Sequence, residues 1–408
     1  MIKIMRWLLL AFVLSAAFSA TARAGTIQAA SCSQSDVQNA IGSASSGDLV
    51  QVPGGSATWS AQVLIPNTVG IILDGGGCNL TISSPLVGLM VFQNATTTSE
   101  VRNFTFTNCN SPTNPVLSVS GTSSSATFRI DNNTFNVSGG SKVCLQAGGD
   151  SPGLIDHNTF NVDSTSGGTE VIHNVGMGAD DSSGWADDVV PGSSNMVFIE
   201  TNTFTFNCTG NPCYYWGTSA VQSYYGARTV FRYNNVTMMQ VDTHGSCGAI
   251  NGRWTEVYNN AFTTVNNANQ AAYVVMRGGS GLIWGNSQSG PNDGGGNIQI
   301  TEDCTSGTYP ITDQIGRGVN QTLSPMYVWG NATIMGVIDT NTAFIQLNRD
   351  YYPASSQPSN LVRCQSAADV SAGCPVSYTY TPYTYPHPLT SASGSPAPPT
   401  NVSATIEN

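Results

Sequence analysis

Residues 221–286 read VQSYYGARTVFRYNNVTMMQVDTHGSCGAINGRWTEVYNNAFTTVNNANQAAYVVMRGGSGLIWGN. Three short lines within this stretch end alike, in Tyr233-Asn234-Asn235, Tyr258-Asn259-Asn260 and Trp284-Gly285-Asn286, so their last Asn recurs at steps of 25 and 26 residues. The unit is too short for a domain, and its apolar and polar residues alternate as in strands rather than with a helical period. We therefore expect each repeat to be one turn of a β-solenoid.

The same pattern continues on both sides of this stretch. RIDNNTF (129–135), LIDHNTF (154–160) and FIETNTF (198–204) lie upstream, and VWGN (328–331) lies downstream. Stacked strands are about 4.8 Å apart, so an Asn at the same bend of every coil can bond through its amide to the Asn above and below. The Phe of each Asn-Thr-Phe line is expected to point inward. The predicted ladder, with gaps of 25, 44, 33, 25, 26 and 45 residues, is Asn133, Asn158, Asn202, Asn235, Asn260, Asn286 and Asn331.

The first residues predict export. Lys3 and Arg6 precede an apolar run from Trp7 to Phe18, and Ala22-Arg23-Ala24 follows it, which is the pattern of a Sec-type signal peptide cleaved after Ala24. The run is too short to span a membrane, and no other run of spanning length follows. We expect a protein that is secreted, or held at the cell surface or in the periplasm, without membrane insertion.

The charge composition excludes one class of partner. Charged residues make up 9 % of the chain, against roughly 25 % in ordinary soluble domains, and the net charge is -11. No basic face exists that could neutralise phosphates, so nucleic acid is not expected to bind. An anionic ligand would need local Arg side chains. We expect the protein to be a monomer.

Ten Cys residues, an even number in an exported chain, favour disulfides over metal sites. Cys208/Cys213 and Cys364/Cys374 are close enough in sequence to staple loops. Cys32/Cys78 could tie the N-terminal region to an early coil. The pairing of the remaining cysteines stays open.

The segment SQSDVQNAIGSA (33–44) predicts a helix that Ser33 or Ser35 could cap, with Val37, Ala40 and Ile41 on one side. The first coil of a solenoid exposes unpaired backbone groups, so this helix is expected to cover it. We divide the chain into a signal peptide (1–24), an N-terminal cap with its helix (25–44), a β-helix (45–375), a Tyr- and Pro-rich C-terminal cap (376–389) and a flexible tail (390–408).

A family resemblance rests on four features. They are the cap helix, the GDLVQVPGG turn (47–55), the repeated IDHNTF-like lines, and the run that joins VFRYNN, DTHG, GRWTEVYNN and RGGSGLIWGN. Together they resemble the secreted right-handed parallel β-helix proteins of the pectate-lyase-like superfamily, over most of the chain after the signal peptide. The resemblance implies an all-β, single-stranded right-handed parallel β-helix. It carries over no catalytic residue, because this fold hosts polysaccharide lyases, glycoside hydrolases, esterases, phage tailspikes and non-catalytic adhesins.

Candidate site residues gather in the central repeats. Arg228 and Arg253 each lie seven residues before a predicted ladder Asn, so they are expected to stack on adjacent coils. Two guanidinium charges about 5 Å apart repel by roughly 3 kcal/mol at an effective dielectric near 20, which favours an anionic ligand or an acidic partner between them. The same coils carry Tyr224, Tyr225, Asp242, His244 and Arg277. We predict that these side chains form one patch.

Structural roles remain open for several of these residues. The two Arg side chains could bridge to Asp242 and Glu256, and His244 could be a turn residue. His157 and His387 are expected to be structural, whereas His173 is open.

The segment between Asn158 and Asn202 holds Asp180-Asp181 and Asp187-Asp188 around Trp185. Paired carboxylates beside an aromatic residue suit an inverting hydrolase, a Ca²⁺ site or a solvated acidic loop. No spacing of an EF-hand is present, so no metal ligand is assigned and Ca²⁺ stays a possible cofactor.

Two classes of function follow. A polysaccharide lyase acting on a uronate polymer needs charge neutralisation at the carboxylate, a base for the C5 proton and an acid for the leaving oxygen. Arg253, Arg228 and Arg277 could neutralise, His244 or a Tyr could be the base, and Tyr224 or Tyr225 the acid, with Asp242 and Trp185 also contacting the acidic polysaccharide. The second class is a non-catalytic glycan-binding adhesin that uses the same face. A hydrolase built on the Asp pairs is the third possibility.

Overall fold

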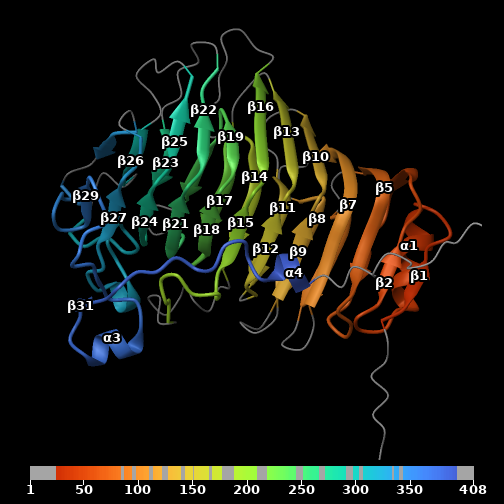
Figure 1. Cartoon of the computed structure of the whole chain (residues 1–408), viewed down its shortest axis with the longest axis horizontal. Helices are drawn as coiled ribbons and strands as arrows, with labels where there is room; N and C mark the ends of the chain where they lie inside the picture. The colour runs from red at the N-terminus through yellow and green to blue at the C-terminus, as the bar shows by residue number, and fades with distance from the viewer. Residues whose placement is uncertain are drawn as a thin grey trace, which may run out of the picture.

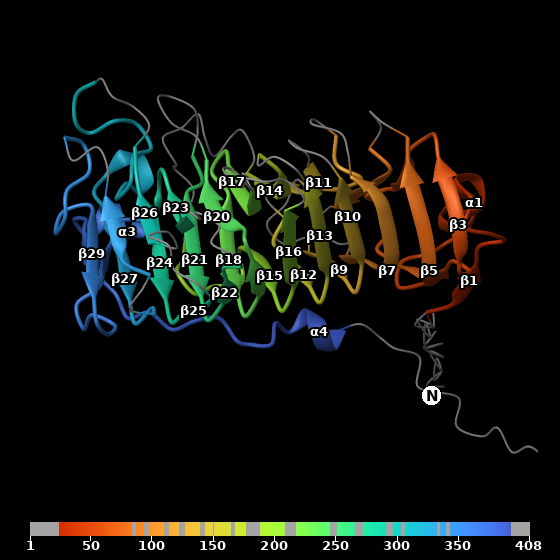
Figure 2. The ribbon, with the colours of Figure 1, turned by 90° about the horizontal axis from the view of Figure 1, so that it is seen from above.

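The computed structural model describes residues 24–392 except for 84–86, 94–97, 110–113, 122–126, 139–142, 150, 165–167, 177–187, 209–217, 245–250, 266–271, 291–296, 303–306, 333–334 and 340–342. Strands stack in parallel along one long axis, coil upon coil (Figures 1 and 2). The predicted β-solenoid is confirmed.

The strands lie on three faces, and each central coil, from β9 (Thr127–Asp131) to β26 (Asn297–Ile300), contributes one strand to each face. Face A contains β1 (Thr26–Gln28), β2 (Leu49–Gln51), β9 (Thr127–Asp131), β12 (Gly153–Asp156), β15 (Val197–Glu200), β18 (Arg228–Arg232), β21 (Trp254–Tyr258), β24 (Ser280–Trp284), β27 (Met326–Trp329) and β29 (Tyr351–Ala354). Face B contains β3 (Gly55–Trp59), β10 (Thr134–Ser138), β13 (Thr159–Ser164), β16 (Thr203–Cys208), β19 (Asn235–Thr237), β22 (Ala261–Thr263) and β25 (Ser287–Ser289). The long strands β5 (Ile72–Ile82) and β7 (Thr98–Cys109) run through the bend from face A to face B, which joins both faces into one 19-stranded sheet.

Face C is a separate 10-stranded sheet. Its strands are β4 (Val63–Ile65), β6 (Leu89–Gln93), β8 (Leu117–Gly121), β11 (Val143–Gly149), β14 (Glu170–Val175), β17 (Ser219–Tyr224), β20 (Gln240–Thr243), β23 (Ala272–Met276), β26 (Asn297–Ile300) and β28 (Val337–Asp339). Near the C-terminus, β30 (Val362–Arg363) pairs with β31 (Val376–Ser377), and a 3₁₀ helix, η1, spans Val319–Gln321.

An Asn ladder forms the bend between faces A and B. In the central pair, Asn260 Oδ1 accepts from the backbone N of Asn234 at 2.9 Å and from its Nδ2 at 3.0 Å. The same two bonds link the other neighbours, and the residue before each ladder Asn has a left-handed φ of 54° to 66°. The ladder in the structure is Asn133, Asn158, Asn202, Asn234, Asn260, Asn286 and Asn331.

One rung of the predicted ladder is wrong. Strands β18 and β21 pair Arg232 with Tyr258, so Asn234 lies opposite Asn260 and the step is 26 residues rather than 25. Tyr233 occupies the left-handed position that Asn259 occupies one coil later. Asn235 instead begins β19 as an exposed residue. The prediction aligned Tyr233 with Tyr258, and this alignment is one residue out of the observed register.

The Phe residues of the Asn-Thr-Phe lines form a stack inside the solenoid, as predicted. Phe106, Phe135, Phe160 and Phe204 are fully buried, and successive ring centroids are 4.9, 4.8 and 4.7 Å apart. Burying such rings removes apolar surface from water at every coil, and each offset pair adds about 0.5–1.5 kcal/mol beyond the area term.

Two predicted disulfides, Cys32–Cys78 and Cys364–Cys374, are confirmed. A third, Cys109–Cys144, joins β7 to β11 across the interior, with Cα atoms 5.1 Å apart. The predicted Cys208–Cys213 pair lies outside the described residues because Cys213 does.

The predicted N-terminal helix is α1 (Gln34–Gly42). Ser33 Oγ accepts from the backbone N of Asp36 at 3.3 Å, and Val37, Ala40 and Ile41 are buried where α1 meets β3 and β4. Its capping role stays a prediction. Two further short helices are α3 (Ala367–Ser371) and α4 (Leu389–Ala392). Within the described part of the chain, no helix has the length and apolar character needed to span a bilayer.

Residues 376–392, here called the C-terminal strap, run along face A (Figures 1 and 2). Tyr380 and Leu389 pack with Phe198, Trp254 and Tyr258 in an apolar cluster that is separate from the solenoid interior. Arg232 donates to the carbonyls of Tyr383 at 2.6 Å and Thr384 at 2.9 Å. The Tyr- and Pro-rich segment therefore covers the side of the coils along much of face A.

Candidate functional site

The candidate site lies on the outer surface of face C, where β14, β17 and β20 are in register. His173 pairs with Gln222, and Gln222 pairs with Asp242. Their neighbours Ile172, Val221 and Val241 point into the buried core. Since side chains alternate along a strand, the three polar residues point outward in one row.

Tyr224 lies two residues beyond Gln222 on β17, between His173 and His244. Its ring centroid is 5.2 Å from that of His173 and 5.0 Å from that of His244, so the two imidazoles flank it. The hydroxyl hydrogen-bonds to Gln222 and lies 3.5 Å from Glu170 Oε1. Burial first, and then the negative charges of Glu170 and Asp242, raise the pKa of the Tyr224 hydroxyl. The hydroxyl therefore keeps its proton at neutral pH and donates it in hydrogen bonds.

A buried carboxylate, that of Asp242, contacts two other residues of the site. Asp242 is 1 % exposed, and its two oxygens lie 3.1 Å from Arg277 Nε and 3.6 Å from His244 Nδ1. The backbone N of Arg277 also donates to Thr243 Oγ1 at 2.8 Å, which holds the backbone of Arg277 beside Thr243. His244 is 40 % exposed in its side chain, so one face of its ring is open to a ligand.

Sequence reasoning missed Glu170 and left His173 open. Glu170 Oε2 hydrogen-bonds to His173 Nε2, three residues along β14. A long segment separates β14 from β17 in the chain, so the register between His173 and Gln222 could not be predicted from the sequence. The segment EVIHNV (170–175) has the same alternation of apolar and polar residues as the neighbouring strands. This alternation was the signal from which a strand carrying Glu170 and His173 could have been predicted. We call the set Glu170, His173, Gln222, Tyr224, Asp242, His244 and Arg277 the Tyr224 patch.

The structure thus brings together most of the predicted residues. Tyr224, Asp242, His244 and Arg277 are in the patch, and Tyr225 lies beside it, 48 % exposed, with its ring 6.2 Å from that of Tyr224. Trp185, Asp180, Asp181 and Asp187 lie outside the described residues. Asp188 is described, and its carboxylate accepts from the backbone N of Ala367 at 2.7 Å, at the start of α3.

The predicted stack of Arg228 on Arg253 is wrong. Arg228 pairs with Trp254 across β18 and β21, so Arg253 is one residue out of register. Arg253 is fully buried and donates to the carbonyl of Gln365 at 3.2 Å. A polymer at the surface does not reach such a side chain, and the repulsion argument no longer applies.

Arg228 lies in different surroundings from Arg253. It lines a cavity of about 30 Å³ with Asn174, Ser151, Met196 and Gly226. This space holds roughly one water molecule and is too small for a sugar ring.

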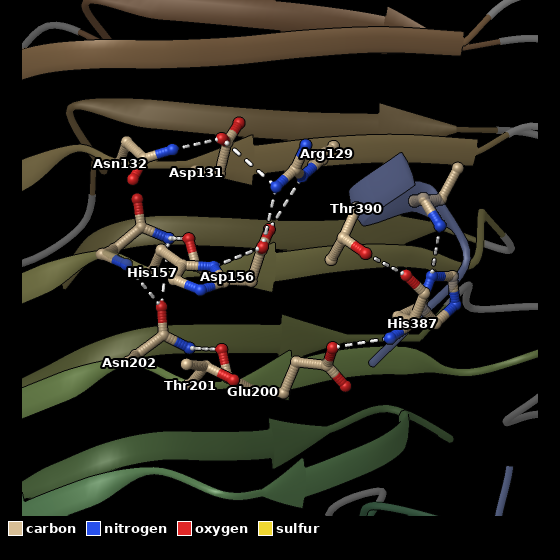
Figure 3. A network of polar contacts seen from close by, with 12 residues as sticks. Arg129, Asp131, Asn132, Asp156, His157, Glu200, Thr201, Asn202, His387 and Thr390 are labelled. Atoms are coloured by element: carbon tan, nitrogen blue, oxygen red, sulfur yellow. Dashed lines mark hydrogen bonds and ion pairs between the residues drawn. The ribbon is translucent and has the colours of Figure 1, made fainter. Parts of the chain in front are cut away.

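Face A carries a second polar cluster (Figure 3). Arg129 binds Asp156 through two bonds of 2.9 Å and lies 3.4 Å from Asp131. His157 Nδ1 is 2.7 Å from Asp156 Oδ2. Burial and the neighbouring Glu100 raise the pKa of Asp131 to about 7. Arg129, Asp131 and Asp156 are buried and paired, so they form a structural network. His157 is bonded to Asp156, but its side chain is 49 % exposed, and its structural role stays a prediction.

His387 sits at the far end of this region, on the strap. Its backbone N donates to Glu200 at 2.9 Å, and its ring Nδ1 accepts from the backbone N of Leu389 at 3.2 Å. Burial and the nearby Arg232 charge lower the pKa of its imidazole to about 4. His387 is thus a structural residue, as expected.

Among the described residues, no group of three or more His, Cys, Asp or Glu side chains is arranged to hold a metal ion.

A structure of a PL6 family alginate lyase mutant matches with a TM-score of 0.37 and 13 % sequence identity, over 88 % of this chain and 57 % of that one. The chain thus spans little more than half the length of that lyase. No family model matches the chain, and no curated protein matches it in sequence.

Proposed function

We propose that the protein is a secreted, carbohydrate-active β-helix protein that cleaves a uronate-containing polysaccharide by β-elimination. The observation that carries the proposal is the position of Tyr224 between two imidazoles, next to the Asp242–Arg277 pair. A proton donor, a proton acceptor and a positive charge are then within reach of one sugar ring.

The roles follow from the geometry. His244 takes the C5 proton, and Asp242 stabilises the imidazolium that forms, because its carboxylate is 3.6 Å away. The C5–H electrons form the C4=C5 double bond, the C4–O bond breaks, and Tyr224 gives its proton to the leaving oxygen. Arg277 attracts the carboxylate of the same sugar, which favours the negative charge that develops there.

One observation favours a second candidate, a non-catalytic glycan-binding solenoid. The patch contains two carboxylates, Glu170 and Asp242, against the single guanidinium of Arg277. A neutral polysaccharide meets less repulsion at such a patch than a polyuronate does. A hydrolase would need other carboxylates, and the Asp pairs proposed for it lie outside the described residues apart from Asp188.

The test is a screen of the mature protein against polyuronates and neutral polysaccharides. We expect unsaturated uronate, seen by its ultraviolet absorbance, to rise together with reducing ends. Reducing ends alone would indicate a hydrolase, and binding without either signal would indicate a glycan-binding protein.

Matched variants locate the activity. Tyr224→Phe and His244→Asn are expected to lower turnover by about 10²-fold or more, the typical contribution of one acid or base. Tyr352→Phe and His157→Asn serve as controls, because Tyr352 bonds to the Asn348 carbonyl at 2.7 Å and His157 lies on face A. Equal turnover in all four variants would remove the Tyr224 patch from the mechanism.

A further inference from the structure

Face B carries two rows of uncharged side chains on its outer surface, with a register shift between β7 and β10 after Phe135. The first row is Ser56, Asn79, Thr105, Thr134, Thr159, Thr203, Asn235, Ala261 and Ser287. The second row, two residues further along each strand, is Thr58, Thr81, Thr107, Asn136, Asn161, Thr205, Thr237, Thr263 and Ser289. All but Ala261 bear a hydroxyl or an amide.

The rows have a regular spacing in two directions. Along the solenoid axis, the Phe rings beneath four of the coils, from Phe106 to Phe204, repeat every 4.7 to 4.9 Å with interplanar angles of 4° to 10°. The next pair, Phe204 and Phe231, is 5.6 Å apart and tilted by 37°. Across the axis, residues two apart on a parallel strand are about 6.6 Å apart. Over these four coils, the Phe stack therefore supports a regular, two-dimensional array of polar groups.

The polar groups are also fixed in orientation. Thr81 and Thr107 share a hydrogen bond of 2.9 Å, and Asn161 donates to Asn136 at 3.0 Å. Thr263 and Ser289 share another of 3.0 Å. Threonine is further restricted at χ1 because it is β-branched. An array that is already ordered loses little entropy when it binds an ordered partner.

The face B strands carry very little charge. Across the face B strand segments, Asp163 is the one charged residue, and it lies outside both rows. No Tyr or Trp occupies a row position, so the flat aromatic surface on which sugar rings stack is missing from the rows. Of the described segments, the strap lies over face A, and Figure 1 shows the face B strands with none across them. The partner that fits is uncharged and periodic.

We propose that face B binds the surface of ice. Ice presents water oxygens in regular rows, so a regular array of hydroxyl and amide groups can bond to several of them at once. Hydroxyl and amide groups bond to lattice water, and the Thr methyl groups rest in the gaps between these waters. The site takes water in crystalline order as its ligand, and it is independent of the Tyr224 patch on face C.

Ice binding is measured on the mature protein as inhibition of ice recrystallisation and as enrichment in a slowly grown ice sphere. The variant Thr159→Lys/Thr203→Lys interrupts the first row in mid-face with two charged, flexible side chains. Thr98→Lys is the control, because Thr98 is exposed but lies at the start of β7 on face A. Melting curves check that all proteins are folded.

We expect the parent and Thr98→Lys to be enriched in ice and to stop recrystallisation, and the double Lys variant to lose both effects. A parent protein that stays in the liquid would overturn the proposal. So would a double Lys variant as active as the parent, or binding of face B to an insoluble neutral polysaccharide in place of ice. Polysaccharide turnover of the double Lys variant is recorded separately, so loss of one function is distinguished from loss of the other.

Discussion

At the scale of single residues, the Asn ladder stabilises a bend that many residue types would otherwise resist. The left-handed positions before the ladder hold Asn132, His157, Thr201, Tyr233, Asn259, Gly285 and Gly330. This conformation costs non-glycine residues roughly 1–2 kcal/mol. The Asn that follows offsets that cost, because its amide accepts two bonds from the coil before it and donates to a buried carbonyl.

Asn260→Ala is expected to destabilise the protein by about 1–3 kcal/mol, because it leaves two donors of Asn234 without their acceptor in a buried site. The measurement is chemical or thermal unfolding. Asn235→Ala is the matched control, since Asn235 is exposed and outside the ladder. Equal melting curves for the two variants would show that the ladder does not contribute to stability.

Asp131 makes the folded protein more stable at low pH than at high pH. Its folded-state pKa is raised to about 7 from 3.8, by burial and by Glu100, so the folded state holds a proton that the unfolded state has lost between these values. This contribution is present at low pH and is lost as pH rises through about 7. Asp131→Asn keeps the shape of the protonated acid and removes its ionisation. As pH increases from 5 to about 8, we expect the melting temperature of the parent to fall relative to that of the variant. A difference between the two melting temperatures that stays constant with pH would contradict the shifted pKa.

At the scale of elements, the strap is held by buried polar groups on face A. Glu256 is fully buried and accepts from Tyr380 OH at 2.7 Å, from Trp254 Nε1 at 3.0 Å and from the backbone N of Gly192 at 2.8 Å. Burial raises the pKa of this carboxyl. Every donor lost from Glu256 therefore leaves a desolvated carboxyl less well satisfied.

Tyr380→Phe is expected to cost about 1–3 kcal/mol and to increase amide exchange in residues 376–392 before the coils unfold. Tyr352→Phe removes a hydroxyl that bonds to Asn348 O at 2.7 Å near the surface, and it is expected to have a smaller effect. Exchange that increases equally in the strap and in the coils would show that the strap has no opening of its own.

At the scale of the whole molecule, the sequence predicts the solenoid well because one coil repeats the same local chemistry. Alternation, the Asn at the bend and the inward Phe are all visible in short lines. The same one-residue misalignment of Tyr233 with Tyr258 explains both errors, the Asn235 rung and the Arg228–Arg253 stack. His173 and the strap could not be placed from sequence, because their positions depend on contacts across long or Pro-rich segments.

The three faces are separate surfaces on one rigid stack, which leads to a prediction about combined changes. Thr203 lies on face B and His244 on the site of face C, with the Phe stack and the aliphatic core between the two sheets. Sites with no shared partners add within about 0.3–0.5 kcal/mol. We therefore expect the loss of stability in the variant Thr203→Lys/His244→Asn to equal the sum of the two single losses, as measured by denaturant unfolding. Non-additivity above that limit would mean that the core transmits strain between the faces. In that case, the ice-binding rows and the Tyr224 patch could not be altered independently.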